Sequence, residues 1–160
     1  MQTNKISPRL LAMLSLVLYF ICLVTPAYHP VIGYAEAGVY YGWAALLLGP
    51  IGLFGGHFSW LANPLLWFSW SKFESKNYNA ALGASILAIM MALTFLLNGT
   101  IPVGSSGSYK YEVLFGYYLW LGSVVLAGFA AGTSRKRSQS APNLTAEETP
   151  SDEAARRSSL

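Results

Sequence analysis

The sequence predicts an all-α polytopic membrane protein, a bundle of four transmembrane helices with a kinked second span and a disordered C-terminal tail. Three observations lead to this prediction. The chain is 54% hydrophobic and only 11% charged, whereas soluble domains carry about 25% charged residues. The thirty-five residues between Glu36 and Lys72 contain no Asp, Glu, Lys or Arg. Apolar runs recur through residues 1–133, whereas residues 134–160 hold more than half of the charged side chains.

The first span is predicted over residues 10–25. Lys5 and Arg9 precede its fifteen-residue apolar core. The alternative is a cleaved signal peptide, because basic residues before a short apolar run are typical of one. Aromatic residues within the run and the proline at position 26, which would end a helix in any case, favour a retained span.

The next apolar segment, residues 39–70, is predicted to cross the membrane once. A single crossing places seven of the eight basic residues that flank spans on one side and Lys110 alone on the other. Two crossings would place three of these basic residues on the side of the N-terminus and five on the opposite side, so the larger number would lie away from the N-terminus. Basic residues concentrate on the cytoplasmic side, so we expect both termini in the cytoplasm and outward loops near residues 25–38 and 98–112.

A crossing of about 20 residues occupies residues 39–59 and leaves residues 60–70 (WLANPLLWFSW) at the interface or partly re-entrant. Pro64 predicts a helix break near residues 62–63, where the Asn63 side chain can bond the freed backbone groups. Tryptophans favour membrane interfaces. The predicted interfacial anchors of this segment are Trp60, Trp67 and Trp70.

Small residues recur along the second span at intervals of 4, 3, 4, 3 and 4, which places them on one face of a helix. Such faces let helices approach closely in lipid. We predict packing against a helix of the same chain; a second copy is the alternative. Pro50 should kink this span and leave the Leu46 carbonyl without its backbone hydrogen-bond donor. Replacement of Gly49 or Gly52 by leucine should disrupt the packing. The helix-packing residues are Gly38, Gly42, Ala45, Gly49, Gly52 and Gly56.

Two further spans are predicted over residues 80–98 and 114–133. Each carries its own small-residue face, which we interpret as a seam of the bundle. We interpret Asn98-Gly99-Thr100 as a helix end and not as a glycosylation site. The small residues are Ala81, Ser85, Ala88 and Ala92 in the third span and Gly116, Ser123, Ala127 and Ala130 in the fourth.

Residues 134–160 are polar, without apolar periodicity, and are predicted to form a disordered cytoplasmic tail. Arg135, Lys136 and Arg137 should anchor the start of this tail to anionic headgroups. Short matches to phosphoserine-binding and C-terminal peptide motifs in the tail are interpreted as chance.

Few residues suggest chemistry. His57 is the one histidine in the uncharged stretch, and intramembrane ionisable residues are functional candidates. Counted from the start of the second span it should lie near the cytoplasmic interface. His29, Glu36 and Glu112 could form a weak metal site, but their spacing is unspecific, so no metal or cofactor is predicted. No nucleophile has a recognisable base and carboxylate in the sequence, and we expect no enzyme.

Two motifs carry a resemblance. The segment His57–Leu66 (HFSWLANPLL) and the later Gly116–Leu121 (GYYLWL) resemble a group of small uncharacterised bacterial inner-membrane proteins with a Trp-x-Ala-Asn-Pro-Leu-Leu element and a last span beginning Gly-Tyr-x-Leu-Trp-Leu. The resemblance covers the second to fourth spans. It implies a four-helix fold in the bacterial inner membrane and brings no activity with it.

Together these observations predict a non-catalytic inner-membrane protein that acts through helix–helix contacts with itself or a larger membrane protein, with the lipid bilayer and not nucleic acid as its surroundings. The alternative is a small-solute or ion-handling protein with a cavity near His57 and Asn63. A cavity lined by both residues would favour the alternative, whereas a dry seam of glycines would favour helix packing.

Overall fold

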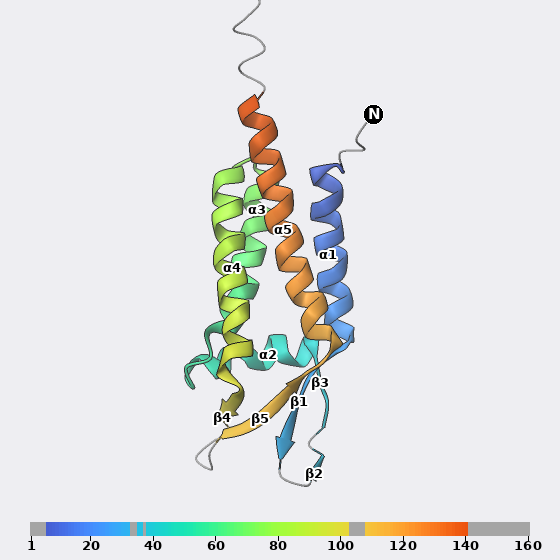
Figure 1. Cartoon of the computed structure of the whole chain (residues 1–160), viewed down its shortest axis with the longest axis vertical. Helices are drawn as coiled ribbons and strands as arrows, with labels where there is room; N and C mark the ends of the chain where they lie inside the picture. Colours follow the sequence, from blue (N-terminus) through green and yellow to red (C-terminus); the bar gives the residue numbers. More distant parts are fainter. Residues whose placement is uncertain (1–5, 33–34, 37, 103–107, 141–160) are drawn as a thin grey trace, which may run out of the picture.

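The computed structural model describes residues 6–32, 35–36, 38–102 and 108–140. Four helices run side by side along the long axis of the molecule, and a fifth, α2, lies across one end of them (Figure 1). We call the end where α1 begins and α5 finishes the terminal end, and the opposite end the sheet end. The helices are α1 (Pro8–Val24), α2 (Gly42–Leu53), the short 3-10 helix η1 (Phe58–Leu61), α3 (Ala62–Glu74), α4 (Tyr78–Asn98) and α5 (Phe115–Ser140).

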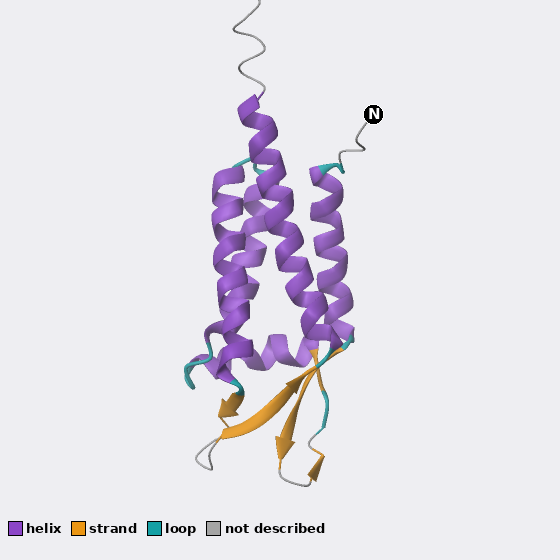
Figure 2. Cartoon of the chain, in the orientation of Figure 1, coloured by secondary structure: helices purple, strands orange, loops and turns teal. Residues whose placement is uncertain are grey.

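The chain is mostly helical, as predicted, but the two connecting segments at the sheet end also form a small antiparallel sheet (Figure 2). Its strand order is β2-β1-β5-β4, with β3 also paired to β1. Aromatic and β-branched residues in these segments favour strands, and α1 and α4 deliver both segments to the same end of the bundle. The strands are β1 (Pro26–Ile32), β2 (Ala35–Glu36), β3 (Tyr40–Tyr41), β4 (Thr100–Pro102) and β5 (Ser108–Val113).

Among the described residues, two helices are long and apolar enough to cross a membrane, α4 and α5. The pair formed by α2 and the η1–α3 segment passes the same criteria together, but it is bent by 118°. Counted as one broken span, it raises the number to three. Helix α1 is apolar and shorter, with 17 residues.

The second span differs from the prediction. Residues 39–59 do not form one crossing helix, because α2 ends at Leu53 and the chain turns sharply before η1. Gly56 lies in this turn with a φ of +81°, a conformation that glycine adopts without steric cost. The long-axis element of the segment is therefore residues 58–74, and α2 lies across its base.

The predicted break near residues 62–63 is also wrong. The chain is helical from Phe58 to Glu74 and changes from 3-10 to α geometry at Ala62. Pro64 lies in the first turn of α3, where a missing amide hydrogen is tolerated. The carbonyl of Trp60, four residues before Pro64, accepts a hydrogen bond from Asn63 Nδ2 at 3.2 Å, so the Asn63 side chain replaces the donor that proline lacks.

Pro50 lies inside α2 and removes the usual donor for the Leu46 carbonyl. The indole of Trp60 supplies another donor: Nε1–H bonds the Leu46 carbonyl oxygen at 2.8 Å. This bond joins α2 to η1 across the bend. The predicted orphan carbonyl is therefore used to fix the position of α2.

The small-residue faces of α4 and α5 are buried where these helices pack together and against α1 and α3. Serine hydroxyls also bond within this interior. Ser69 Oγ lies 2.7 Å from Ser85 Oγ, and Ser15 Oγ donates to the Ser123 carbonyl at 2.7 Å. The buried residues of the two faces are Ala81, Ser85, Ala88, Ala92, Gly116, Ser123, Ala127 and Ala130.

The C-terminal helix is longer than predicted. Helix α5 continues to Ser140, so residues 134–140 are helical and the disordered tail does not begin at position 134. Arg135, Lys136 and Arg137 are exposed on these last turns. Residues 141–160 lie outside the described part of the chain.

The bond between Trp60 and the Leu46 carbonyl predicts a coupling with Pro50. Trp60→Phe should lower stability by about 1 kcal/mol, the scale of hydrogen bonds between membrane helices. Pro50→Ala returns an amide donor to Leu46, so the same Trp60→Phe change should cost less in that background. Unfolding of the four proteins in one detergent gives the coupling energy.

Trp43→Phe is the control for this cycle, because Trp43 lies on α2 and is exposed. It should leave stability nearly unchanged. An equal cost of Trp60→Phe with proline or alanine at position 50 would contradict the proposed role of the bond.

Candidate functional site

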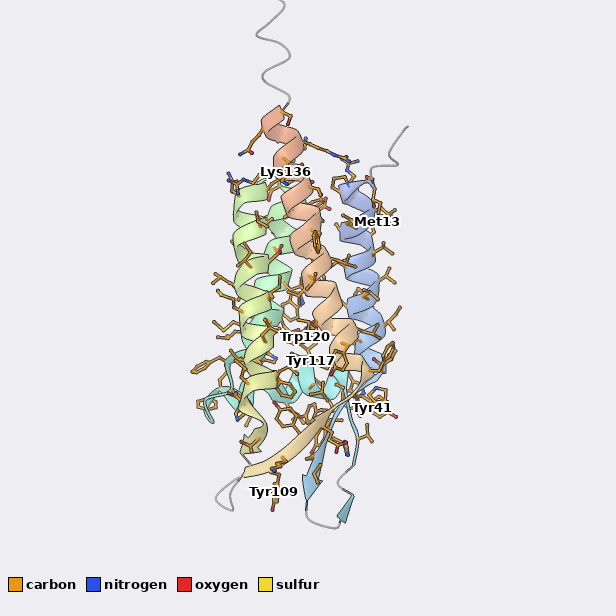
Figure 3. The ribbon with its side chains drawn as sticks, in the orientation of Figure 1. Met13, Tyr41, Tyr109, Tyr117, Trp120 and Lys136 are labelled. Carbon is orange, nitrogen blue, oxygen red and sulfur yellow. The ribbon has the colours of Figure 1, made fainter. Side chains whose placement is uncertain are left out.

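A cavity of about 400 Å³ lies between α2, the sheet and the sheet-end turns of α1, α4 and α5. Tyr117 and Trp120 of α5 lie at this end of the bundle, next to α2 (Figure 3). None of the described residues that line the cavity is Asp, Glu, Lys or Arg. The described lining therefore carries no carboxylate, ammonium or guanidinium group; His57 also belongs to it.

The small residues of α2 form one wall of this cavity. Four of the six predicted helix-packing residues line it: Gly42, Ala45, Gly49 and Gly52. Gly38 precedes β3 and Gly56 lies in the turn after α2, so neither belongs to the helix. Because three of these residues have no side chain and Ala45 has only a methyl group, this space stays open, a role that the predicted packing seam did not include.

Two of these glycines also make close contacts. A Cβ on Gly42 would lie 2.1 Å from the carbonyl oxygen of Cys22, at the end of α1. A Cβ on Gly49 would lie 2.0 Å from Cδ1 of Trp60. At Gly52 the nearest atom would be His57 Cβ at 3.5 Å, an ordinary contact. Gly42 and Gly49 are thus required for packing, whereas Gly52 is not.

Asn63 is the polar centre of the cavity wall. It is only 7% exposed. Its Oδ1 accepts hydrogen bonds from Trp120 Nε1 at 3.0 Å and from the Tyr19 hydroxyl at 3.4 Å, while Nδ2 donates to the Trp60 carbonyl. An amide nitrogen carries two hydrogens. The second hydrogen has no protein acceptor among the described residues.

The three predicted interfacial tryptophans use their indole N–H groups inside the bundle. Trp60 bonds the Leu46 carbonyl, Trp67 Nε1 donates to the Tyr19 hydroxyl at 3.1 Å, and Trp70 Nε1 donates to Ser15 Oγ at 3.1 Å. Each bond joins two helices. Indole N–H groups in apolar surroundings need such partners.

His57 lies at the sheet end, not near the opposite end as predicted. Its Nδ1 lies 3.2 Å from Nδ2 of Asn98, the last residue of α4. The amide nitrogen can only donate, so Nδ1 accepts and Nε2 carries the hydrogen in this arrangement. The depth estimate failed because α2 lies across the bundle and does not descend along it. The fold therefore brings His57 and Asn63 to one cavity.

Aromatic rings supply much of the remaining wall. Tyr28 and Tyr40 stack with ring centroids 5.1 Å apart, and Phe95 stacks on Tyr117 at 5.5 Å. The Tyr111 hydroxyl donates to the Phe95 carbonyl. Burial raises the pKa of Tyr28, in the sheet, to about 12, so its hydroxyl stays neutral at physiological pH. The sequence did not point to Tyr28 and Tyr40 as part of this wall, because no strands were expected in their segment.

Two of the three residues of the hypothetical metal site lie close together. His29 and Glu112 face each other across β1 and β5, with Nε2 3.7 Å from Oε2. The side chain of Glu36 lies outside the described part of the structure. Among the described residues no group of three His, Cys, Asp or Glu side chains could hold a metal ion. The pair is therefore a cross-strand contact within the sheet.

Comparison with protein-family models, with curated proteins and with solved structures gives no match for this chain. The resemblance to small bacterial membrane proteins stays a prediction that rests on its two motifs. The structure brings those motifs together: Asn63 of the first accepts the hydrogen bond from Trp120 of the second. One clue to this contact was present in the sequence. An amide side chain within an apolar segment needs hydrogen-bond partners, and these must come from elsewhere in the chain.

The contacts of the glycines predict opposite outcomes for two similar changes. Gly49→Ala should lower stability by about 1–3 kcal/mol, because its Cβ collides with Trp60 and displaces the indole. Gly52→Ala should be neutral or stabilising by up to about 1 kcal/mol, since a glycine inside a helix is costly. Thermal unfolding in detergent would compare the stability of the two variants. Equal changes in stability would contradict the close packing of Trp60 against Gly49.

Removal of the Asn63 side chain should weaken the junction of α1, α3 and α5. Asn63→Ala leaves the buried donors of Tyr19 and Trp120 without this acceptor, so we expect a loss of about 2–3 kcal/mol. Asn79→Ala on exposed helix surface is the matched control and should be near neutral. Thermal unfolding together with tryptophan fluorescence would measure the loss, and unfolding of both variants at the wild-type temperature would refute it.

Proposed function

We propose that the protein is a four-span integral membrane protein, with both termini in the cytoplasm, that binds a small and largely apolar molecule in the cavity between α2 and the bundle. The observation that carries the proposal is the cavity itself, lined by both His57 and Asn63. The motif resemblance makes the bacterial inner membrane the expected location.

The distribution of side chains supports placing all four long-axis helices in lipid. Large apolar residues such as Met13, Leu97 and Phe129 are exposed on the outside, whereas the fully buried positions include several serines and alanines. Helix α4 has 21 residues, a length of about 31 Å that matches the hydrocarbon core. Helices α1, α3 and α5 lie beside it (Figure 1).

The charge distribution supports the orientation. Six of the seven basic residues in the described part of the chain belong to the terminal end, and Lys110 in β5 is at the sheet end. Since basic residues concentrate in the cytoplasm, the terminal end is cytoplasmic in this proposal and the sheet lies outside. The six residues are Arg9, Lys72, Lys76, Arg135, Lys136 and Arg137.

The lining of the cavity supports a neutral ligand that is mostly apolar. Its volume of about 400 Å³ lies in the range of small-molecule sites, which combine apolar walls with a few polar groups. Asn63 and His57 supply such groups. The absence of carboxylates among the described lining residues argues against a cation as the cargo.

Helix α2 supports access from the bilayer. Leu47, Ile51 and Phe54, on or directly after this helix, are 68%, 66% and 94% exposed, as expected for a surface in contact with lipid. An acyl or isoprenoid chain could reach the cavity past this helix. The small-residue stripe faces the cavity, so it offers less support for a role in binding a second copy or a larger membrane partner.

The proposal predicts that filling the cavity blocks binding. A fatty acid probe with a photoreactive diazirine should label residues of the cavity wall in lipid nanodiscs, and excess unlabelled fatty acid should compete. Ala45→Phe places a ring in the cavity and should remove most of the competed labelling. Mass spectrometry of the labelled peptides measures it.

Ala44→Phe is the matched control, because Ala44 is next in the same helix and does not line the cavity. It should retain the competed labelling. Labelling confined to outer, lipid-facing residues, or equal labelling of the Ala44 and Ala45 variants, would overturn the proposed site.

A further inference from the structure

A second cavity, of about 510 Å³, lies at the terminal end. Its wall comes from the start of α1, the turn between α3 and α4, and the last turns of α5. Because α5 extends to Ser140, it forms one side of this cavity. The predicted disordered tail would have left that side open.

Three cations from three separate elements line this cavity: Arg9 of α1, Lys76 of the α3–α4 turn and Arg137 of α5. Glu74 is the one carboxylate among the described lining residues, so the cations outnumber it by three to one. Like charges brought together from distant parts of the chain repel one another. An anion in the cavity would relieve this repulsion.

Two of the three cations come from positions with defined local geometry. Arg137 Nη2 donates to the Ile6 carbonyl at 3.3 Å, which joins α5 to the segment before α1. Lys76 has a φ of 59°, in the left-handed region that is uncommon for residues other than glycine. The turn that presents Lys76 therefore has a defined backbone geometry. The Arg137 side chain and the Lys76 backbone are thus defined parts of the cavity wall.

Hydroxyl groups complete the wall. Ser134 lines the cavity although it is only 8% exposed. Ser7 and Tyr78 add further hydroxyls. Arginine and hydroxyl donors together suit phosphate oxygens.

The position of the cavity identifies the source of the phosphate. Tyr78 is the first residue of α4, and a 21-residue helix that crosses the hydrocarbon core begins at headgroup level. We infer that this cavity binds the phosphate of an anionic phospholipid headgroup in the leaflet at the terminal end. Glu74 would accept a hydrogen bond from a headgroup hydroxyl, which favours glycerol-bearing lipids. The inference rests on the proposed membrane placement and is independent of the ligand cavity.

The test compares retained lipids by native mass spectrometry. Full-length protein is exchanged into mixed phosphatidylglycerol and phosphatidylcholine vesicles and released into mild detergent. We expect phosphatidylglycerol to be retained in preference to phosphatidylcholine. The triple variant Arg9→Gln, Lys76→Gln, Arg137→Gln should reduce that preference by at least about tenfold, since each cation near a headgroup contributes several-fold.

The control variant Lys110→Gln, Arg135→Gln, Lys136→Gln removes the same charge from residues that do not line the cavity. Because Arg135 and Lys136 are expected to attract anionic headgroups only through general surface charge, this variant should lose clearly less of the preference than the triple variant. An equal loss in both variants would show a general surface effect and overturn the site. Binding of soluble glycerol phosphate or inorganic phosphate as tight as that of the lipid would overturn the lipid as occupant. Unchanged photolabelling of the α2 cavity in the triple variant shows that the fold is intact and separates this test from the proposed function.

Discussion

The hydrogen bond from the Trp60 indole to the Leu46 carbonyl fixes α2 against η1, and the cavity depends on that position of α2. This bond exists because Pro50 leaves that carbonyl without a backbone donor and because Gly49 has no side chain in the path of the indole. The bond holds α2 across the end of the bundle, at 118° to the η1–α3 segment. Without this bend, residues 42–53 would continue along the bundle and the cavity would have no wall.

Asn63 links that bend to the rest of the molecule. Its side chain covers the carbonyl that Pro64 leaves free and accepts hydrogen bonds from α1 and α5. One amide thus satisfies a local backbone defect and joins three helices at the cavity wall. Because the oxygen already accepts from Tyr19 and Trp120, the hydrogen-bonding capacity that remains on this side chain is mainly that of a donor. Both prolines of the segment are therefore compensated by side chains that build the site.

Small residues have two different uses in this chain. In α4 and α5, Ala88 and Ala127 are buried between helices, as the spacing of these faces predicted, because close helix contacts require small side chains wherever they occur. In α2 the same spacing lines an open cavity. Sequence spacing shows that one face of a helix carries only small side chains. Whether that face packs against another helix or lines a cavity depends on the direction of the helix.

The sequence by itself determined the apolar helices of spanning length, the small faces of α4 and α5, and the free carbonyl of Leu46, because composition, helical spacing and the missing proline amide are local properties. Only the tertiary structure decided that α2 lies across the bundle, that His57 is at the sheet end, and that Asn63 meets Trp120. These features depend on contacts between residues distant in the chain, and on a glycine turn whose angle no local pattern specifies.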